Sequence, residues 1–434
     1  MKPDKTDKIV VGIETALKEQ KIPCAVVDVK DAPQLTRYEI VPGYKMLSPN
    51  SRTPRQRVPI RAIASAIPNI MAQLRREKMS LYQNGSVYII VPKEKRDLVT
   101  LRDVRTLPGS LVAKFGIDID GNSLAGDIAA MPHLMISGST GSGKSVFISS
   151  LVTSLIERYS ERQLGFVMID PKRVELQAYK RIKHLLLPVV TDIENEAGVA
   201  IDFVIAEMMS RYRKMEKAEV NLASQIGIPY LILLIDEFAD MVMRDETLPA
   251  KIASIAQMGR AAGIHMIFAT QRPDARVVDG IIKVNFPARV AFALPDGVNS
   301  RIAIGKLGAE NLLMRGDGLY VSGGGDTIRF QGCFVSKDEI KAIVQANLRE
   351  GPLPGLSPAS STQSHASSRP RRDYSQHHWT VQIALFVLRA IWFIIKNVAI
   401  GIAFALGIVI GIVAGVIMWV FGIDPQPKKR KRRK

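Results

Sequence analysis

The eight residues from Gly138 to Ser145 carry the clearest chemistry in the chain. They read Gly-Ser-Thr-Gly-Ser-Gly-Lys-Ser and match the pattern G-x-x-x-x-G-K-[ST] of a phosphate-binding loop. Glycines let such a loop curl so that its backbone N–H groups point at phosphate oxygens. Lys144 adds positive charge for the β and γ phosphates, and Ser145 offers a hydroxyl to Mg²⁺. We therefore expect ATP and Mg²⁺ to bind at Gly138, Ser139, Thr140, Gly141, Ser142, Gly143, Lys144 and Ser145.

A phosphate loop also needs an acidic partner at the end of a neighbouring strand. Five apolar residues, Leu231–Ile235, run into Asp236 and Glu237. We expect Asp236 in the Mg²⁺ shell and Glu237 as the general base that activates the attacking water. Another apolar run ends in Asp170, which alone is weaker evidence. A third ends in Gln271, whose amide can sense the γ phosphate; the alternative is an ordinary hydrogen-bonded loop glutamine.

The elements that must position these residues follow a regular alternation between about residues 116 and 350. Apolar runs of four to eight residues are separated by helical patterns, which is typical of βαβ units and of a parallel sheet covered on both faces. The sequence therefore predicts one α/β domain over 116–350. The expected strands are 133–137, 165–170, 230–236, 265–270 and 288–293, and the clearest expected helices are 145–159 and 196–214.

Residues 1–115 differ in pattern and predict a small α+β domain. Helical periodicity covers 9–20 and 60–77, and short strand patterns cover 25–29, 36–41 and 86–91. Four arginines gather near the middle of this region, at Arg52, Arg55, Arg57 and Arg61. Such a cluster is either a solvated basic face or a surface that faces DNA.

Composition narrows the class of protein. The 434 residues include 59 Lys and Arg against 41 Asp and Glu, a formal charge of +18. This charge favours a polyanionic partner, either nucleic acid or an anionic membrane surface. Two cysteines among 434 residues exclude a disulfide framework and suit a reducing compartment. With 47% apolar residues the chain can build a full-sized core, which excludes wholesale disorder.

The C-terminal quarter predicts a tether and a membrane anchor. Residues 351–379 are rich in Pro, Ser and Gln and read as a flexible linker. Residues 398–421 are 24 consecutive uncharged residues, about 36 Å of helix, which is enough to span a bilayer. Residues 380–397 read as an amphipathic interfacial helix, or as a first, shorter membrane pass that carries Arg389 inside it.

The last segment, 422–434, is a polybasic tail. A single pass would leave it on the side of the membrane opposite to the α/β domain, whereas two passes would return it to the cytoplasm, where the positive-inside tendency favours it. Within the expected span, Ala403, Gly407, Gly411 and Gly415 recur every four residues and line one side of a helix. This is either a helix-packing face or glycine that the span merely tolerates.

Taken together, these stretches resemble the FtsK/SpoIIIE family of DNA translocases, which are hexameric motors that move double-stranded DNA. The similarity runs in family order over about residues 8–345. Its most specific parts are Met131–Leu134 leading into the phosphate loop, Ile169–Leu176, Ile235–Met241, Gly259–His265 and Ala269–Pro273.

The resemblance implies a RecA-like motor domain, a preceding small domain and a homo-hexameric ring around the duplex. Arg260 matches the position of the family's arginine finger, which acts on the neighbouring subunit's ATP. Arg272 and Arg301 match DNA-contacting pore-loop positions, and Arg276 and Lys283 are nearby basic candidates.

The chain also departs from the family pattern. Gly297 replaces the usual pore-loop lysine, and Asn299 replaces an aspartate. We expect no winged-helix domain after the motor, and a membrane anchor after the motor instead of before it. We therefore expect a motor on the cytoplasmic side of the cell membrane that pumps DNA of a mobile element, with other transfer or division machinery as possible partners. The alternatives are a protein-secretion ATPase, a chromosome-segregation translocase and a non-catalytic scaffold.

Overall fold

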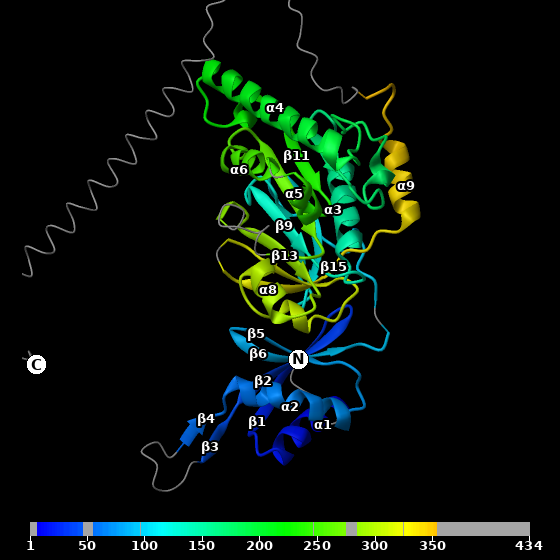
Figure 1. The fold of residues 1–434 in the computed structure, drawn as a ribbon. Helices are drawn as coiled ribbons and strands as arrows, with labels where there is room; N and C mark the ends of the chain where they lie inside the picture. Colours follow the sequence, from blue (N-terminus) through cyan, green and yellow to red (C-terminus); the bar gives the residue numbers. More distant parts are fainter. Residues whose placement is uncertain are drawn as a thin grey trace, which may run out of the picture. The chain divides into compact units, whose positions relative to one another are not determined.

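A computed structural model describes residues 7–46, 55–95, 97–245, 247–274, 284–323 and 325–353, all of which belong to one compact unit (Figure 1). The predicted linker beyond Leu353, the segment 380–397, the span 398–421 and the tail 422–434 lie outside these residues, as do Arg276 and Lys283. Among the helices of the described ranges, none is long and apolar enough to cross a membrane.

The N-terminal region forms a four-stranded antiparallel sheet with the strand order β1-β2-β6-β5. Two helices pack on this sheet, and their apolar stripes supply Ile13, Leu17, Ile63 and Ile70 to its core. The sequence predicted both helices and three of the four strands. The elements are α1 (Lys8–Glu19), β1 (Cys24–Asp31), β2 (Leu35–Pro42), the short pair β3 (Tyr44–Met46) and β4 (Arg55–Arg57), α2 (Ile60–Gln73), β5 (Ser80–Asn84) and β6 (Ser86–Pro92).

The second sheet has nine strands in the order β10-β11-β12-β9-β13-β14-β15-β7-β8. Its first five strands are parallel, as predicted, and its last four run antiparallel. The predicted parallel strands are thus confirmed, and four antiparallel strands that were not predicted extend the same sheet. The strands are β7 (Val112–Asp118), β8 (Ser123–Asp127), β9 (His133–Ser137), β10 (Leu164–Ile169), β11 (Tyr230–Ile235), β12 (Ile264–Thr270), β13 (Ala288–Phe292), β14 (Asp317–Val321) and β15 (Thr327–Gly332).

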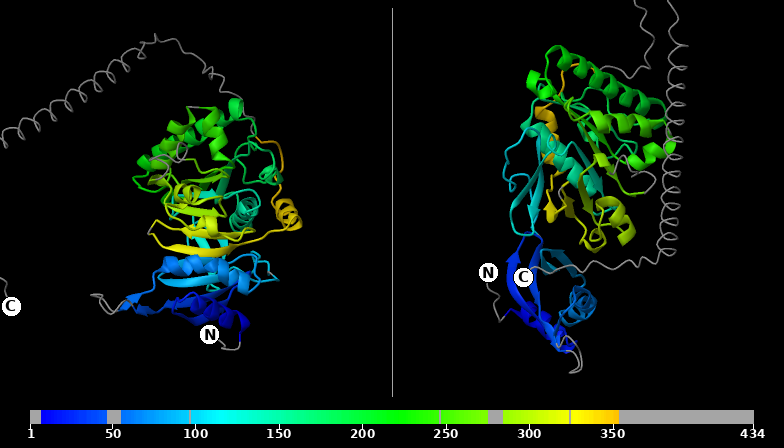
Figure 2. Two further views of the ribbon diagram at one scale, coloured as in Figure 1. Left: turned by 60° about the horizontal axis from the view of Figure 1, so that its bottom comes forward. Right: turned by 90° about the vertical axis from the view of Figure 1, so that its left-hand side faces the viewer.

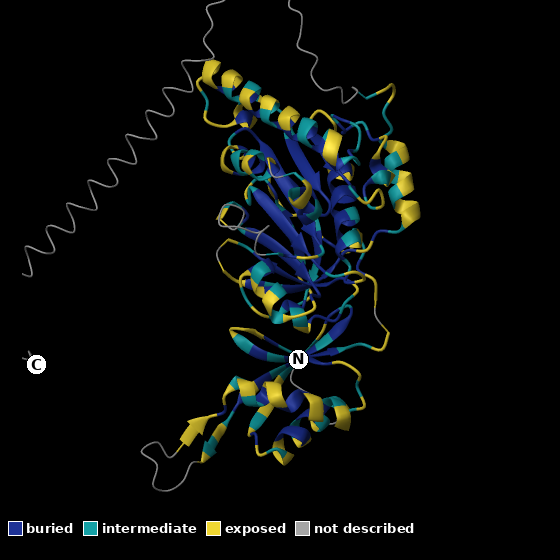
Figure 3. Ribbon diagram, viewed as in Figure 1, coloured by how far each residue is buried: buried dark blue, intermediate teal, exposed yellow. Residues whose placement is uncertain are grey.

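Helices cover both faces of this sheet, and the strands between them are almost fully buried (Figures 2 and 3). Along β11, Leu231 and Leu233 join one apolar cluster while Ile232 and Leu234 join the other, as a two-residue repeat requires. One cluster includes α4 (Gly198–Lys217), α5 (Phe238–Arg244), α6 (Leu248–Met258) and α8 (Gly297–Ile304). The other includes α3 (Lys144–Arg158) and α9 (Lys337–Ala346).

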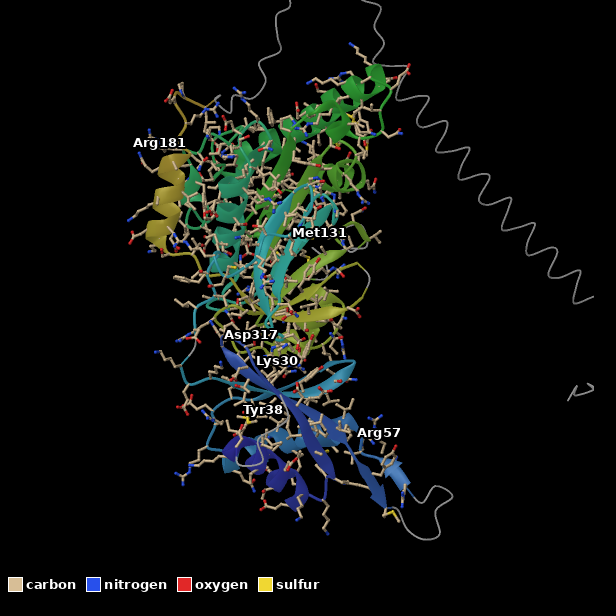
Figure 4. All side chains as sticks on the ribbon, turned by 180° about the vertical axis from the view of Figure 1, so that it is seen from behind. Lys30, Tyr38, Arg57, Met131, Arg181 and Asp317 are labelled. Carbon is tan, nitrogen blue, oxygen red and sulfur yellow. The ribbon has the colours of Figure 1, made fainter. Side chains whose placement is uncertain are left out.

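Polar contacts join the small sheet to the large one. Arg37 of β2 pairs with Asp120 at 2.9 Å, and Lys78 Nζ donates to the Leu312 carbonyl at 2.8 Å. Arg329 of β15 reaches Ser80 Oγ at 3.0 Å, and its partner Asp317 lies at the junction in Figure 4. Because β7 begins at Val112 and belongs to the large sheet, the expected domain boundary at 115/116 falls inside a strand.

Candidate nucleotide site

The phosphate loop lies where the sequence predicted it, between the end of β9 at Ser137 and the start of α3 at Lys144. Two of its glycines are required by backbone geometry, since φ is +77° at Gly141 and +111° at Gly143. A Cβ at Gly143 would also overlap the backbone N of Gly316, which donates a hydrogen bond to the Ser142 carbonyl at 2.7 Å. The loop is thus held against the start of β14.

Unpaired polar groups in this loop fit a bound phosphate. Ser142 Oγ is buried and has no hydrogen-bond partner among the described residues. Lys144 is 3% exposed, and its Nζ donates to Asp236 Oδ1 at 2.7 Å. Because an ammonium group has three donor positions, this contact leaves capacity for phosphate oxygens. The loop opens into a cavity of about 510 Å³, which Ser139, Thr140, Gly141, Gly143, Lys144 and Ser145 line on one side.

Part of the wall of this cavity is apolar and was not predicted. Leu98, Val99, Cys333 and Phe334 line it, and the Phe334 N–H donates to the Val99 carbonyl at 2.7 Å. Burial raises the pKa of the Cys333 thiol to about 12, so this wall stays uncharged at neutral pH. Such a surface can hold the flat face of a nucleobase. No local pattern could have found it, because the two sides of the wall are more than 230 residues apart in the sequence.

Asp236 and Glu237 follow β11, which is parallel to and two strands away from β9. Both are buried, with 1% and 3% of their surface exposed. The chain turns sharply between β11 and α5, so that Glu237 takes a left-handed backbone conformation with φ of +66°. The structure thus brings both acids to the edge of the sheet where the phosphate loop lies.

The Glu237 carboxylate accepts hydrogen bonds from three residues. Lys172 Nζ donates to Oε2 at 2.7 Å, Thr270 Oγ1 donates to Oε1 at 2.9 Å, and the Gln271 backbone N–H donates to both oxygens at 3.1 and 3.3 Å. Burial alone would raise the pKa of Glu237. The hydrogen bonds from Lys172 and Gln271, together with the charge of Lys144, outweigh it and lower that pKa. Glu237 is therefore a carboxylate at neutral pH.

Gln271 joins this group through its side chain. Thr140 Oγ1 of the phosphate loop donates to Gln271 Oε1 at 3.3 Å, and Gln271 lines the phosphate-loop cavity. Gln271 also lines a second cavity of about 410 Å³, which Lys172, Glu237, Asp240 and Arg272 share. Lys172 and Thr270 had no predicted role at this site, although Lys172 lies in one of the stretches that resemble the family.

Arg260 lies at the other edge of the sheet. It precedes β12, whereas the phosphate loop follows β9, and these two strands are parallel neighbours. The amino end of β12 and the carboxyl end of β9 are at opposite edges of the sheet. Arg260 lines a separate cavity with Asp127, Tyr230 and His265. The structure therefore does not bring Arg260 to the phosphate loop of its own chain.

The two described DNA candidates lie on different elements. Arg272 is exposed and directly follows Gln271, and its backbone N–H donates to Thr270 Oγ1 at 3.2 Å. Arg301 is exposed on α8, a helix that begins at Gly297 and is capped by Asp296 through the Asn299 N–H at 2.8 Å. Arg301 therefore lies outside the nucleotide site.

Comparison with known proteins shows which family the central part of the chain resembles. The family model for the FtsK/SpoIIIE family matches residues 96–227 and 222–275. The DNA translocase FtsK of Caldanaerobacter subterraneus subsp. tengcongensis is 38% identical over 352 residues, 76% of this chain and 48% of that protein. DNA translocase FtsK 1 of Neisseria meningitidis serogroup A is 35% identical over 398 residues, 81% of this chain and 48% of that protein. The chain thus spans less than half the length of these relatives.

Two solved structures share the fold. The pCW3 conjugation coupling protein TcpA, solved with ATPγS, has a TM-score of 0.54 at 21% identity and covers 78% of this chain and 99% of its own. The type VII secretion ATPase EccC of Thermomonospora curvata has a TM-score of 0.51 at 23% identity, over 58% of this chain and 33% of its own. The fold is that of a P-loop ATPase. Through the matched region, the chain belongs to the FtsK/SpoIIIE family.

Proposed function

We propose that the chain is an ATP-driven translocase of double-stranded DNA. One observation carries this proposal: Lys144, Asp236, Glu237 and Gln271 meet at one edge of the sheet, in a region whose relatives are named DNA translocases. The basic charge of the chain supports a polyanionic substrate.

Each residue of the site has a role in the proposed hydrolysis. The N–H groups of the phosphate loop and Lys144 bind the phosphates, and the wall at Leu98 and Phe334 holds the base. Glu237 takes the proton of the attacking water as general base, and Gln271 orients that water. Ser145 and Asp236 would hold Mg²⁺, which when bound neutralises developing phosphate charge.

We propose a homo-hexamer in which Arg260 completes the neighbouring subunit's site. The support is geometric, because Arg260 and the phosphate loop lie at opposite edges of one sheet. A cation on the edge remote from its own nucleotide can act only on the nucleotide of a neighbour. Delivered across an interface, it stabilises transition-state charge and couples hydrolysis to subunit motion.

The proposed DNA contacts are Arg272 and Arg301, joined by Arg276 and Lys283. Contacts of this kind reach backbone phosphates, so binding should tolerate any sequence and weaken steeply with salt.

The remaining proposals concern the placement of the motor. We propose that a small N-terminal domain and a RecA-like motor are followed by a linker at 351–379, the segment 380–397, a transmembrane helix at 398–421 and a tail at 422–434. The bilayer would hold the motor at the cytoplasmic face of the cell membrane. Transfer of a mobile element, alongside other transfer machinery, is supported by the position of this segment after the motor.

The test is ATP turnover by the purified full chain with and without duplex DNA. We expect DNA to stimulate turnover, and Glu237→Gln to stop turnover while ATP still binds, because the amide keeps the shape of the side chain and loses its basicity. Near-normal turnover by Glu237→Gln would show that another group is the base. If duplex DNA leaves the rate of ATP turnover unchanged, the proposal that duplex DNA is the substrate is contradicted.

A further inference from the structure

The Glu237 carboxylate accepts hydrogen bonds from donors that would weaken it as a general base. A carboxylate offers about four lone-pair sites. In the structure these receive Lys172 Nζ, Thr270 Oγ1 and the Gln271 N–H, which is shared between both oxygens. Three donors thus bind the two oxygens, and of these Lys172 alone brings a full positive charge, which lowers the basicity of the carboxylate. The departure of Lys172 would free Oε2 to accept from the attacking water and would restore that basicity.

Lys172 is the donor best able to leave. Thr270 is the last residue of β12, and the Gln271 N–H is part of the backbone that follows it, so both are fixed by the sheet. Lys172 instead lies on the connection after β10, and its side chain is 37% exposed at the end of a flexible stem. Its contact with Glu237 can therefore break without disturbing the sheet.

A second carboxylate that could pair with Lys172 lines the same cavity. Asp240 lies one helical turn from Glu237 on α5 and, like Lys172, lines the cavity of about 410 Å³. No described residue donates a hydrogen bond or a salt bridge to the Asp240 carboxylate. A lysine that leaves Glu237 can therefore pair with another carboxylate instead of losing its partner altogether.

The cavity also contains the link to DNA. Arg272 lines it, and Thr270 Oγ1 accepts from the Arg272 N–H at 3.2 Å. The single hydroxyl proton of Thr270 lies within reach of both Glu237 Oε1 at 2.9 Å and the Arg272 carbonyl at 3.0 Å. Movement of Arg272 on binding a phosphate would therefore reach the donors that hold Glu237.

We propose that Lys172 is a positioning residue with two alternative ion-pair partners. Paired with Glu237, it holds the base inactive in the DNA-free chain. Paired with Asp240, it leaves the base free when DNA engages Arg272. This inference rests on the proposed function, since it assigns how that same site is regulated.

The experiment compares the full chain with Lys172→Met, Asp240→Asn and the double variant in DNA-free and DNA-stimulated ATP turnover. Lys172→Met removes the restraint and should raise DNA-free kcat roughly three- to tenfold with KM for ATP unchanged. Asp240→Asn removes the second carboxylate partner of Lys172 and should lower DNA-stimulated kcat by a similar factor. The double variant should behave like Lys172→Met, because it has no Lys172 ammonium group to pair with residue 240.

Two controls separate this role from a structural one. Lys172→Arg, which keeps the charge, should restore low DNA-free turnover, and Lys180→Met, the same change at an exposed lysine of the same connection, should leave turnover unchanged. If the wild type responds to DNA but Lys172→Met does not raise DNA-free kcat, or lowers it, the inference fails alone. If the wild type hydrolyses no ATP with or without DNA, the proposed function fails and the inference fails with it.

Discussion

Two buried ion pairs in this molecule differ in whether a cavity and an unpaired polar atom lie beside them. Asp317 accepts from Arg329 Nε at 3.0 Å and from the Leu313 N–H at 2.7 Å, and Arg329 also reaches Ser80 Oγ at 3.0 Å. At the phosphate loop, Lys144 donates to Asp236, but the nearby Ser142 Oγ has no partner in the described part of the chain.

The difference separates a structural pair from a functional one. A buried charge is costly unless its hydrogen bonds are complete, so the Arg329–Asp317 pair is complete within the protein itself. Lys144 instead lines a cavity of about 510 Å³ beside the unpaired Ser142 Oγ, so a ligand bound there can supply further hydrogen-bond partners. The cavity and the unpaired hydroxyl, and not burial, distinguish the two pairs.

The largest expected effect is on stability at the complete pair. Arg329→Met should lower the free energy of unfolding by about 3–5 kcal/mol, because Asp317 is left buried without its counter-charge. Denaturant unfolding of the full chain measures this change. The double variant Arg329→Met/Asp317→Leu should recover most of the loss, since it leaves no buried charge. If the single variant is as stable as the wild type, the pair contributes little and the contrast is wrong.

The pair beside the cavity should respond in function instead. Lys144→Ala should reduce ATP turnover at least ~100-fold, the order of loss seen when one transition-state donor is removed. It should cost less stability than Arg329→Met, because Lys144 lines the cavity and the space that its side chain vacates would admit water to Asp236. ATP at 100 times its Kd should stabilise the wild type by about 2.7 kcal/mol and should stabilise Lys144→Ala much less. Equal stabilisation of both by ATP would place the phosphates elsewhere.

Two buried histidines show a similar contrast, between a ring with both nitrogens hydrogen-bonded and a ring with one unpaired nitrogen. The expected effect on stability is smaller. His133 Nε2 donates to the Ala256 carbonyl at 3.0 Å while its Nδ1 accepts from the Met266 N–H at 2.9 Å, so this ring is complete. His265 Nδ1 donates to the Pro132 carbonyl at 2.8 Å, but its Nε2 has no partner among the described residues. Burial lowers the pKa of His133 to about 3 and that of His265 to about 4.

These shifts predict sensitivity to acid. Because both pKa values lie below the unfolded value of about 6.5, the unfolded chain takes up protons first as the pH falls. Stability is therefore complete above pH 6.5 and is lost below it, by about 2 kcal/mol per histidine at pH 5. Denaturant midpoints across this range measure the slope. His133→Gln and His265→Asn retain the carbonyl contacts without titrating, so each should flatten it. An unchanged slope in both would assign the acid sensitivity to other groups.

The sequence was most informative where one short segment carries the whole signal. The pattern from Gly138 to Ser145 predicted its own loop, and the apolar run before Asp236 predicted β11 and its position at the site. Both depend on local backbone geometry and on strands that are buried on two faces. For the same reason, β9 was predicted with its observed ends.

The features that the sequence did not predict join distant segments. The wall that pairs Val99 with Phe334, and the contact of Lys172 with Glu237, depend on how the sheet is ordered. The antiparallel β14 and β15 were missed because a short, buried hairpin carries neither a helical repeat nor a clear alternation. Arg260 was predicted by resemblance alone, and only the sheet shows why it cannot serve its own site.

The β14–β15 hairpin also has a mechanical consequence. At one end, the Gly316 N–H holds the Ser142 carbonyl of the phosphate loop. Near its other end, the Tyr82 hydroxyl donates to the Thr327 carbonyl, which ties the hairpin to the small sheet. Because its two strands are hydrogen-bonded along their length, the hairpin is stiff. A displacement of the phosphate loop would therefore reach the N-terminal sheet through this hairpin, so that sheet would move together with the nucleotide site.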